Sequence, residues 1–182
     1  METYQPLYEQ RSERGFFGIG IDNPKYEPNV GTLMRSAQIF NAAFTFTIGE
    51  RYKRPRTDTS KSTHHTPTWN FPNFKDFYER RPNNCTLVGV ELDDRAIDID
   101  RFNWDNSVRP VFIMVAEDAG LSADARKMCQ YIIKIPSPKA FSMNVAAAGT
   151  IVMYEYTRFL EQRRRRWELD RSLSNRVKVV AI

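Results

Sequence analysis

The sequence predicts an α/β fold, with one mostly parallel sheet and helices on both of its faces. Short apolar runs typical of strands alternate with segments whose apolar residues recur every three or four positions, as on one face of a helix. The run at residues 110–115 is apolar throughout, as expected for a strand that is covered on both sides. Three of the apolar runs lead directly into helical patterns, which favours strand–helix units packed around a parallel sheet.

The expected elements follow one another along the whole chain. Strands are predicted at residues 15–21, 43–48, 85–91, 110–115 and 131–135. Helices are predicted from Pro28 onward, then at 73–80 with Asn73 as cap, at 123–129 with Ser122 as cap, and from Ser142 to about residue 160. The first helix should bury the face formed by Val30, Leu33, Met34, Ala37 and Phe40.

The other segments define the expected domain organisation. Residues 1–14 are polar and predicted to be flexible, 15–160 form the domain, and 161–182 are a basic extension with an apolar end that packs on the body or meets a second subunit. The polar segment 49–70, which contains the adjacent His64 and His65, is predicted to be a functional or disordered loop. The acidic segment 93–108 is predicted to be a solvated, irregular connection, because its carboxylates do not have the spacing of a calcium loop.

Composition narrows the class of protein. With 182 residues the chain makes one domain, and 41% hydrophobic and 13% aromatic residues exclude a disordered chain. No segment reads as a signal peptide or a membrane span, and the isolated Cys85 and Cys129 indicate reduced thiols in the cytoplasm. The net charge of +5 suits a polyanionic partner. Four consecutive arginines at 163–166 and the basic residues of loop 51–56 either contact phosphates or form solvated faces.

The three junctions between strand and helix carry the candidate site. Asn29 to Arg35 reads Asn-x-Gly-x-x-x-Arg, Glu117 to Ser122 reads Glu-x-x-Gly-Leu-Ser, and Ile135-Pro136 leads to Ser-Met-Asn-Val at residues 142–145. Taken alone, each junction is also explained as a helix start, with Asn29 or Ser142 as cap. The three junctions nevertheless bring helix N-termini to one edge of the sheet, where open α/β sheets bind ligands.

Together, the order and spacing of these motifs resemble the SPOUT class of RNA methyltransferases, specifically its SpoU/TrmH-type 2′-O-ribose branch, over residues 15–159. The resemblance implies an α/β fold with a C-terminal deep trefoil knot, S-adenosyl-L-methionine bound in the knot, a homodimer, and methylation of a ribose 2′-hydroxyl in tRNA or rRNA. No metal is required.

The resemblance also implies roles for individual residues. Arg35 matches the catalytic arginine; we interpret it as a clamp that stabilises the developing alkoxide, because a guanidinium is a poor base. Asn29 would orient Arg35 or contact the partner subunit, Glu117 would fix the active loop, and Ser142 and Asn144 would hold the ribose and the cofactor. The predicted cofactor-binding residues are Val90, Val115, Gly120, Ile135, Ser142 and Met143.

Two departures from the family pattern bear on the cofactor pocket. Val115 stands where the family usually has glycine, and the loop from Ser137 to Phe141 is short. Because of these departures, an alternative interpretation remains: a non-catalytic RNA-binding protein of the same knotted fold whose cofactor pocket is impaired. An unrelated nucleotide-binding α/β protein, without a knot, is a further alternative.

Overall fold

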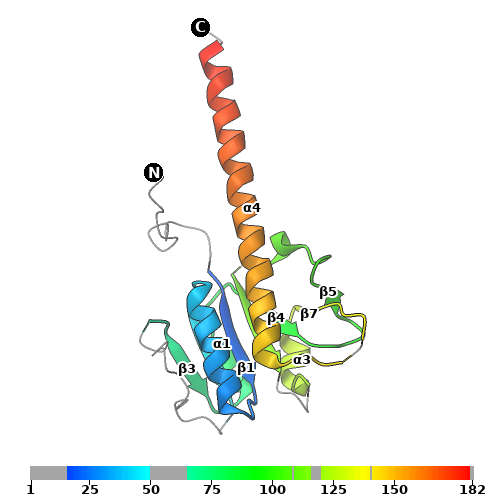
Figure 1. The fold of residues 1–182 in the computed structure, drawn as a ribbon. Coiled ribbons are helices and arrows are strands. Elements are labelled where there is room, and N and C mark those ends of the chain that lie inside the picture. The colour runs from blue at the N-terminus through cyan, green and yellow to red at the C-terminus, as the bar shows by residue number, and fades with distance from the viewer. Residues whose placement is uncertain (1–15, 50–64, 108, 116–119, 140, 181–182) are drawn as a thin grey trace.

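The computed structural model describes residues 16–49, 65–107, 109–115, 120–139 and 141–180. These residues form a seven-stranded parallel sheet with helices packed on it. The strand order is β3-β2-β1-β6-β4-β7-β5 (Figure 1). The strands are β1 Gly18–Asp22, β2 Phe44–Ile48, β3 Thr68–Phe71, β4 Thr86–Val90, β5 Ile97–Asp98, β6 Pro110–Val115 and β7 Tyr131–Lys134. Every strand pair is parallel, which confirms the predicted fold class.

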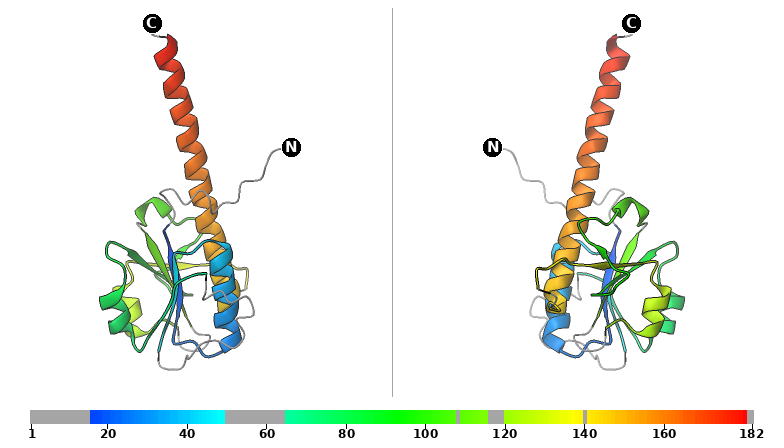
Figure 2. Two further views of the ribbon diagram at one scale, coloured as in Figure 1. Left: turned by 90° about the vertical axis from the view of Figure 1, so that its left-hand side faces the viewer. Right: turned by 90° about the vertical axis from the view of Figure 1, so that its right-hand side faces the viewer.

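Helices cover both faces of this sheet (Figure 2). On one face α1 (Glu27–Ile39) lies beside α4 (Val145–Val180), and on the other lie α2 (Phe74–Arg80) and α3 (Ala123–Met128). Each layer has its own apolar core. The first includes Leu33, Val152 and Tyr156, and the second includes Phe46 stacked on Phe77 at a ring-centroid distance of 4.5 Å.

Local sequence signals position several elements as expected. Strand β6 has the predicted bounds. Both predicted caps of the shorter helices are confirmed, since the Asn73 side chain accepts from the Asp76 N–H and the Ser122 hydroxyl accepts from the Ala125 N–H. At the junction of α1 and α4, a Cβ on Gly149 would lie 2.3 Å from Cδ1 of Leu33, so a larger residue there would require the Leu33 side chain to move.

The predicted caps of two helices are wrong. Helix α1 begins at Glu27 after Tyr26, so Asn29 lies in its first turn and is not its cap. Helix α4 begins at Val145, and Ser142 precedes it. The cap of α4 is Asn144, whose Oδ1 accepts from the N–H groups of Ala146 at 3.0 Å and Ala147 at 3.3 Å.

Two predicted connections contain short regular elements. The polar segment 49–70 includes the start of edge strand β3, which pairs with β2 through Thr45↔Thr68. The segment 93–108 includes β5 and a 3-10 helix, Trp104–Asn106. Asp93 in this segment is buried rather than solvated, and its carboxylate pairs with Arg126 at 2.5 Å and with Arg95 at 3.4 Å.

Helix α4 is longer than predicted. It continues through residue 180 as one helix of 36 residues, about 54 Å at 1.5 Å per residue. Its second half extends away from the sheet (Figure 1). No helix in the described part of the chain combines the length and the apolar character that a bilayer crossing needs.

Some predictions fall on residues that the structure does not describe. The flexible segment 1–14, the basic residues of loop 51–56, His64 and Glu117 lie outside the described residues. The trefoil knot stays a prediction, with which the strand order is compatible.

Candidate functional site

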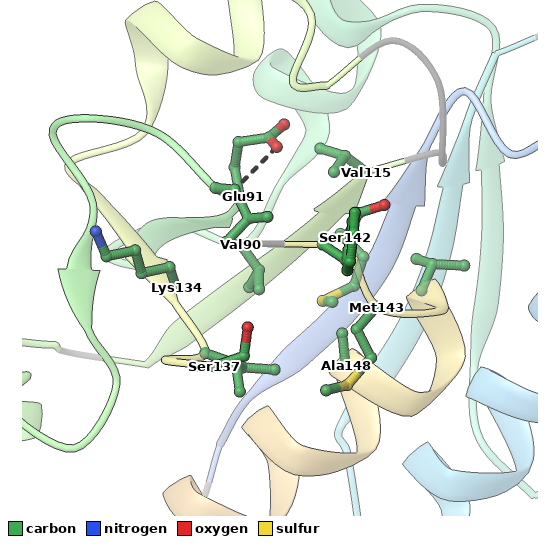
Figure 3. Close-up of a pocket in the computed structure, with 13 residues that line it drawn as sticks. Val90, Glu91, Val115, Lys134, Ser137, Ser142, Met143 and Ala148 are labelled. Atoms are coloured by element: carbon green, nitrogen blue, oxygen red, sulfur yellow. Dashed lines mark hydrogen bonds between the residues drawn. The ribbon is translucent and has the colours of Figure 1, made fainter. Parts of the chain in front are cut away.

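A pocket lies at the carboxyl edge of the sheet, where the adjacent strands β4, β6 and β7 end (Figure 3). Its empty space, with the open mouth included, is about 550 Å³. Its lining residues come from the ends of β4, β6 and β7, from the segments that follow β4 and β7, and from the first turn of α4: Val90, Glu91, Leu92, Met114, Val115, Lys134, Ile135, Ser137, Phe141, Ser142, Met143, Val145 and Ala148.

Five of the six predicted cofactor-binding residues line this pocket. They are Val90, Val115, Ile135, Ser142 and Met143. In the close-up view, Lys134 and Ser137 lie on one side and Ser142 and Met143 on the other, with Val90 between them (Figure 3). The pocket is therefore mainly apolar, with polar groups at separate points of its wall.

Gly120, the sixth predicted residue, lies behind the wall instead of in it. Its φ of +63° is in the left-handed region, and a Cβ there would be 2.8 Å from Oε2 of Glu91. The same carboxylate oxygen accepts from the Leu121 N–H at 2.8 Å, while Oε1 accepts from the Leu92 N–H at 3.1 Å. Gly120 thus lets the chain approach Glu91 closely enough for the bond from Leu121 to form.

Sequence reasoning missed Glu91 and Lys134, the two charged residues of the lining. Lys134 is half-buried and pairs with Asp98 of β5 at 3.9 Å. Both residues lie at the carboxyl end of an apolar strand, as Val115 does. Their position in the sequence therefore indicated a place at the ligand-binding edge of the sheet as clearly as that of Val115. Neither belongs to the three motifs, and the resemblance therefore did not single them out.

The structure joins two predicted catalytic residues that are 115 positions apart. Nδ2 of Asn144 donates to Oδ1 of Asn29 at 3.0 Å, which connects the first turn of α1 to the cap of α4. A second bond between these helices joins the hydroxyls of Thr150 and Ser36 at 2.9 Å. Together they fix the two helix starts beside each other at the edge of the sheet that holds the pocket.

Arg35 is exposed on α1 and is not among the residues that line the pocket. It immediately precedes Ser36, which contacts α4. Its guanidinium is therefore available to a ligand that approaches the α1/α4 junction from outside. Ser142 is also exposed, at the pocket wall.

Two ionisable groups near this edge have shifted pKa values. Hydrogen bonding by the Arg95 N–H, helped by the charges of Arg126 and Arg95, lowers the pKa of Asp93. Burial, reinforced by the charge of Asp22, raises the pKa of Cys129 to about 12. Asp93 is therefore ionised and Cys129 is a neutral thiol at pH 7. In the described part of the chain, no group of three or more His, Cys, Asp or Glu side chains is placed to hold a metal ion.

A pocket at the carboxyl ends of three parallel strands defines the class: an α/β protein that binds its ligand at the edge of the sheet. Within that class, the chain belongs to the SpoU rRNA Methylase family, whose model matches residues 17–154. This confirms the family resemblance of the three motifs.

Two curated proteins are similar in sequence. The 23S rRNA (uridine(2479)-2'-O)-methyltransferase of Streptomyces viridochromogenes is 31% identical over 153 residues, 79% of this chain and 53% of that protein. An uncharacterized tRNA/rRNA methyltransferase of Archaeoglobus fulgidus is 24% identical over 79% of this chain and 65% of its own length. The chain thus spans between half and two thirds of these relatives.

Solved structures share the fold. The SpoU methyltransferase AviRb from Streptomyces viridochromogenes in complex with AdoMet superposes with a TM-score of 0.70, at 25% identity over 84% of this chain and 61% of that one. An AdoMet-bound rRNA methyltransferase from Sinorhizobium meliloti gives a TM-score of 0.72, at 25% identity over 86% and 61%. The A. aeolicus TrmH/SpoU tRNA modifying enzyme, at 20% identity over 83% and 78%, matches in fold with a TM-score of 0.71.

Proposed function

We propose that this protein is an S-adenosyl-L-methionine-dependent methyltransferase that modifies a ribose 2′-hydroxyl in tRNA or rRNA. One observation carries the proposal: the predicted cofactor residues form one pocket, and the predicted catalytic residues Asn29 and Asn144 are bonded to each other at the same edge of the sheet. Membership of the SpoU family and the names of the relatives support the reaction class.

The residues of the pocket fit the cofactor chemically. Val90, Ile135 and Val145 offer an apolar wall to a nucleoside base, while Glu91, Ser137 and Ser142 offer polar groups for a ribose and an amino acid. When bound, the cofactor supplies a methyl group on a positively charged sulfur.

Val115 does not close this pocket. The residue is half-buried at the end of β6, and its side chain forms part of the wall while the space beside it stays open. Nothing in the pocket therefore favours the alternative of an RNA-binding protein with an impaired cofactor site.

The side chains of this protein have separate tasks in the proposed reaction. Methyl transfer is an in-line displacement, so holding the acceptor hydroxyl in line provides much of the rate. Arg35 keeps its proton, since a guanidinium has a pKa above about 12, and stabilises the negative charge that develops on the ribose oxygen. Asn29 and Asn144 hold the starts of α1 and α4 at a fixed separation, which positions Arg35 relative to Ser142. Glu117 keeps its predicted role of fixing the loop between β6 and α3.

A homodimer is part of the proposal. Several large apolar side chains that solvent reaches lie at the two ends of α1, on the first half of α4 and on the segment before α4, and these are Tyr26, Ile39, Phe141, Met143 and Tyr154. Exposed apolar side chains on neighbouring elements are typical of a subunit contact. Free thiols at Cys85 and Cys129 support a cytoplasmic location, which is also where tRNA and rRNA are available.

Two measurements test the proposal. Calorimetry with S-adenosylhomocysteine should detect one site per chain, and incubation of methyl-labelled S-adenosylmethionine with total tRNA and rRNA should label a ribose 2′-oxygen. Absence of binding at high micromolar protein would instead support the non-catalytic RNA-binding alternative. Mapping ribose methylation in cells with and without the protein would identify the nucleotide.

A further inference from the structure

Helix α4 continues beyond the sheet as an exposed helix over residues 162–171. Phe159 and Leu160 still pack against the core of the α1/α4 layer, and Arg163 pairs with Asp105 of the 3-10 helix at 3.6 Å. From Gln162 to Arg171 every residue is exposed, and this segment extends away from the sheet (Figure 1). An isolated helix of this kind gains little from packing, so its surface is available for another purpose.

One stripe of this helix alternates aromatic rings with guanidinium groups. Phe159, Arg163, Trp167 and Arg171 are each four residues apart, so they follow one another along the same side. The Arg163 guanidinium lies 5.7 Å from the ring centroid of Phe159, and that of Arg171 lies 5.2 Å from the ring centroid of Trp167. We call these four residues the arginine–aromatic stripe.

The charges elsewhere on the helix are arranged differently. Arg164 and Arg165 share the carboxylate of Glu161, at 2.9 and 3.1 Å, and Arg164 also pairs with Glu168 at 3.7 Å, which offsets part of their charge. Within the stripe, Arg163 pairs with Asp105 at 3.6 Å, but both side chains are exposed, so water weakens this pair and leaves Arg163 able to bind a phosphate. The arginine–aromatic stripe therefore combines positive charge with an indole ring whose exposed fraction is 46%.

We propose that the arginine–aromatic stripe binds single-stranded RNA outside the methylation pocket. A nucleotide base stacks on Trp167, and the neighbouring phosphates pair with Arg163 and Arg171. Aromatic rings interleaved with cations are the recurrent means of holding unpaired nucleotides, because every base has a face to stack and every linkage has a charge. The proposal deepens the proposed function by adding a substrate contact, and takes from it the choice of RNA as partner.

Two other occupants fit the stripe less well. A second copy that aligned its own stripe here would bring arginines against arginines, which costs free energy. Duplex RNA would satisfy the two arginines but would leave Trp167 without a base, since paired bases are already stacked.

The decisive experiment compares three single substitutions in the full chain. Binding of a short, fluorescein-labelled single-stranded RNA of mixed sequence is measured by anisotropy over a series of salt concentrations, beside a duplex of the same length. Trp167→Ala removes the stacking platform without changing the charge. Arg171→Ala removes a stripe charge, and Arg165→Ala is its matched control, since Arg165 is an exposed arginine on another side of the same helix.

The expected results separate stacking from general charge. Trp167→Ala weakens single-strand binding about five- to one-hundredfold with an unchanged salt slope, and Trp167→Phe restores part of the loss. Arg171→Ala lowers the salt slope by about 0.7, whereas Arg165→Ala changes the affinity less than twofold. If Trp167→Ala binds as wild type, or if Arg165→Ala and Arg171→Ala lose the same affinity, the proposal is wrong.

Two controls keep this test apart from that of the methyltransferase activity. Binding of S-adenosylhomocysteine is unchanged in all variants, because the stripe is remote from the pocket lining, and circular dichroism confirms that the helix persists. If the wild type methylates RNA and Trp167→Ala binds RNA as tightly as the wild type does, the RNA-binding role of the stripe is wrong while the proposed methyltransferase activity stands. If Trp167→Ala instead turns a dimer into monomers and leaves RNA affinity unchanged, the stripe is a subunit contact and the RNA proposal fails.

Discussion

Asn144 combines two structural tasks that the sequence motif does not separate. Its Oδ1 caps α4, while its Nδ2 donates to Asn29 on α1. From the sequence, Ser142 was the expected cap, because serine is a frequent cap and Asn144 then lay inside the helix. The hydrogen bonds assign the cap to Asn144 and leave Ser142 free to face the pocket.

Substitutions at Asn144 should separate these tasks. Asn144→Ser keeps a capping oxygen but is too short to reach Asn29, so we expect nearly unchanged thermal stability with reduced methylation. Asn144→Ala loses both, and its free energy of unfolding should fall by about 1 kcal/mol. Thermal unfolding and turnover of the two variants check this. Equal turnover in Asn144→Ser and wild type would show that the bond to Asn29 has no part in activity.

Arg35 should matter for the reaction and not for the fold. The residue is exposed, so Arg35→Ala should leave the unfolding temperature unchanged. Loss of the group that stabilises the ribose oxygen should reduce turnover about one-hundredfold or more, while the affinity for S-adenosylhomocysteine stays the same. Lys75→Ala, an exposed cation on α2, is the matched control and should remain fully active. Near-normal turnover in Arg35→Ala would refute the assigned role.

Cys129 should be chemically inert in the folded protein. Burial raises its pKa to about 12, so the thiol carries its proton at pH 8 and reacts slowly, because the thiolate is the nucleophile. Iodoacetamide should label it only after denaturation. Since the folded-state pKa is raised, stability associated with this thiol is complete below about pH 9 and is lost as the pH rises toward about 12. Rapid labelling of the native protein at Cys129 would contradict this environment.

At the scale of the element, α4 shows how surface charges maintain an exposed helix. Intrahelical pairs follow one another from Arg158–Glu155 through Arg164–Glu161 to Arg164–Glu168. Each such pair stabilises a helix by only a few tenths of a kcal/mol, and the two pairs made by Arg164 lie beyond Leu160, the last described residue of α4 that packs against the core. The charged composition after residue 161 indicated a helix-prone tail. It did not reveal that this tail and the core helix are continuous, because nothing in the sequence marks a helix end.

The helicity of this segment should depend on pH through Glu161. Hydrogen bonding to Arg164, with help from Arg165, lowers the pKa of this carboxyl. A lowered pKa means that its contribution is complete above the usual value of about 4.3 and is lost as the pH falls further. Circular dichroism should therefore show a decrease in helix signal below about pH 4 in the wild type. Glu161→Gln should lack this component, and identical titrations of the two proteins would contradict the prediction.

At the scale of the whole molecule, a surface on α1 and α4 should determine the oligomeric state. Tyr154 is exposed on α4, in the part of this helix that covers the sheet together with α1. Tyr154→Glu should convert the proposed dimer to monomers, because a buried carboxylate without a partner is costly at a subunit contact. Light scattering coupled to size-exclusion chromatography measures the mass, with Lys75→Glu on α2 as the control. A dimer that survives Tyr154→Glu must use another surface.

The general architecture could be predicted because the strong signals are local. Strand β6 is apolar throughout, and Asn73 and Ser122 act as caps within their own turns, so no distant contact was needed to place them. Strands β3 and β5 were missed because both are short edge strands whose exposed residues resemble loops. Glu91 escaped notice for a related reason: its importance lies in its bond to Leu121, 30 positions away, which no local pattern records.

The walls of the pocket are synthesised at very different times. Val90 and Glu91 leave the ribosome well before Ser142, Met143 and Ala148, so a growing chain can assemble most of its sheet and still lack one side of the ligand cavity. An S-adenosylhomocysteine resin should therefore retain stalled translation products only when they are long enough for the start of α4 to have emerged. The shortest retained product would then report when the last step of folding takes place.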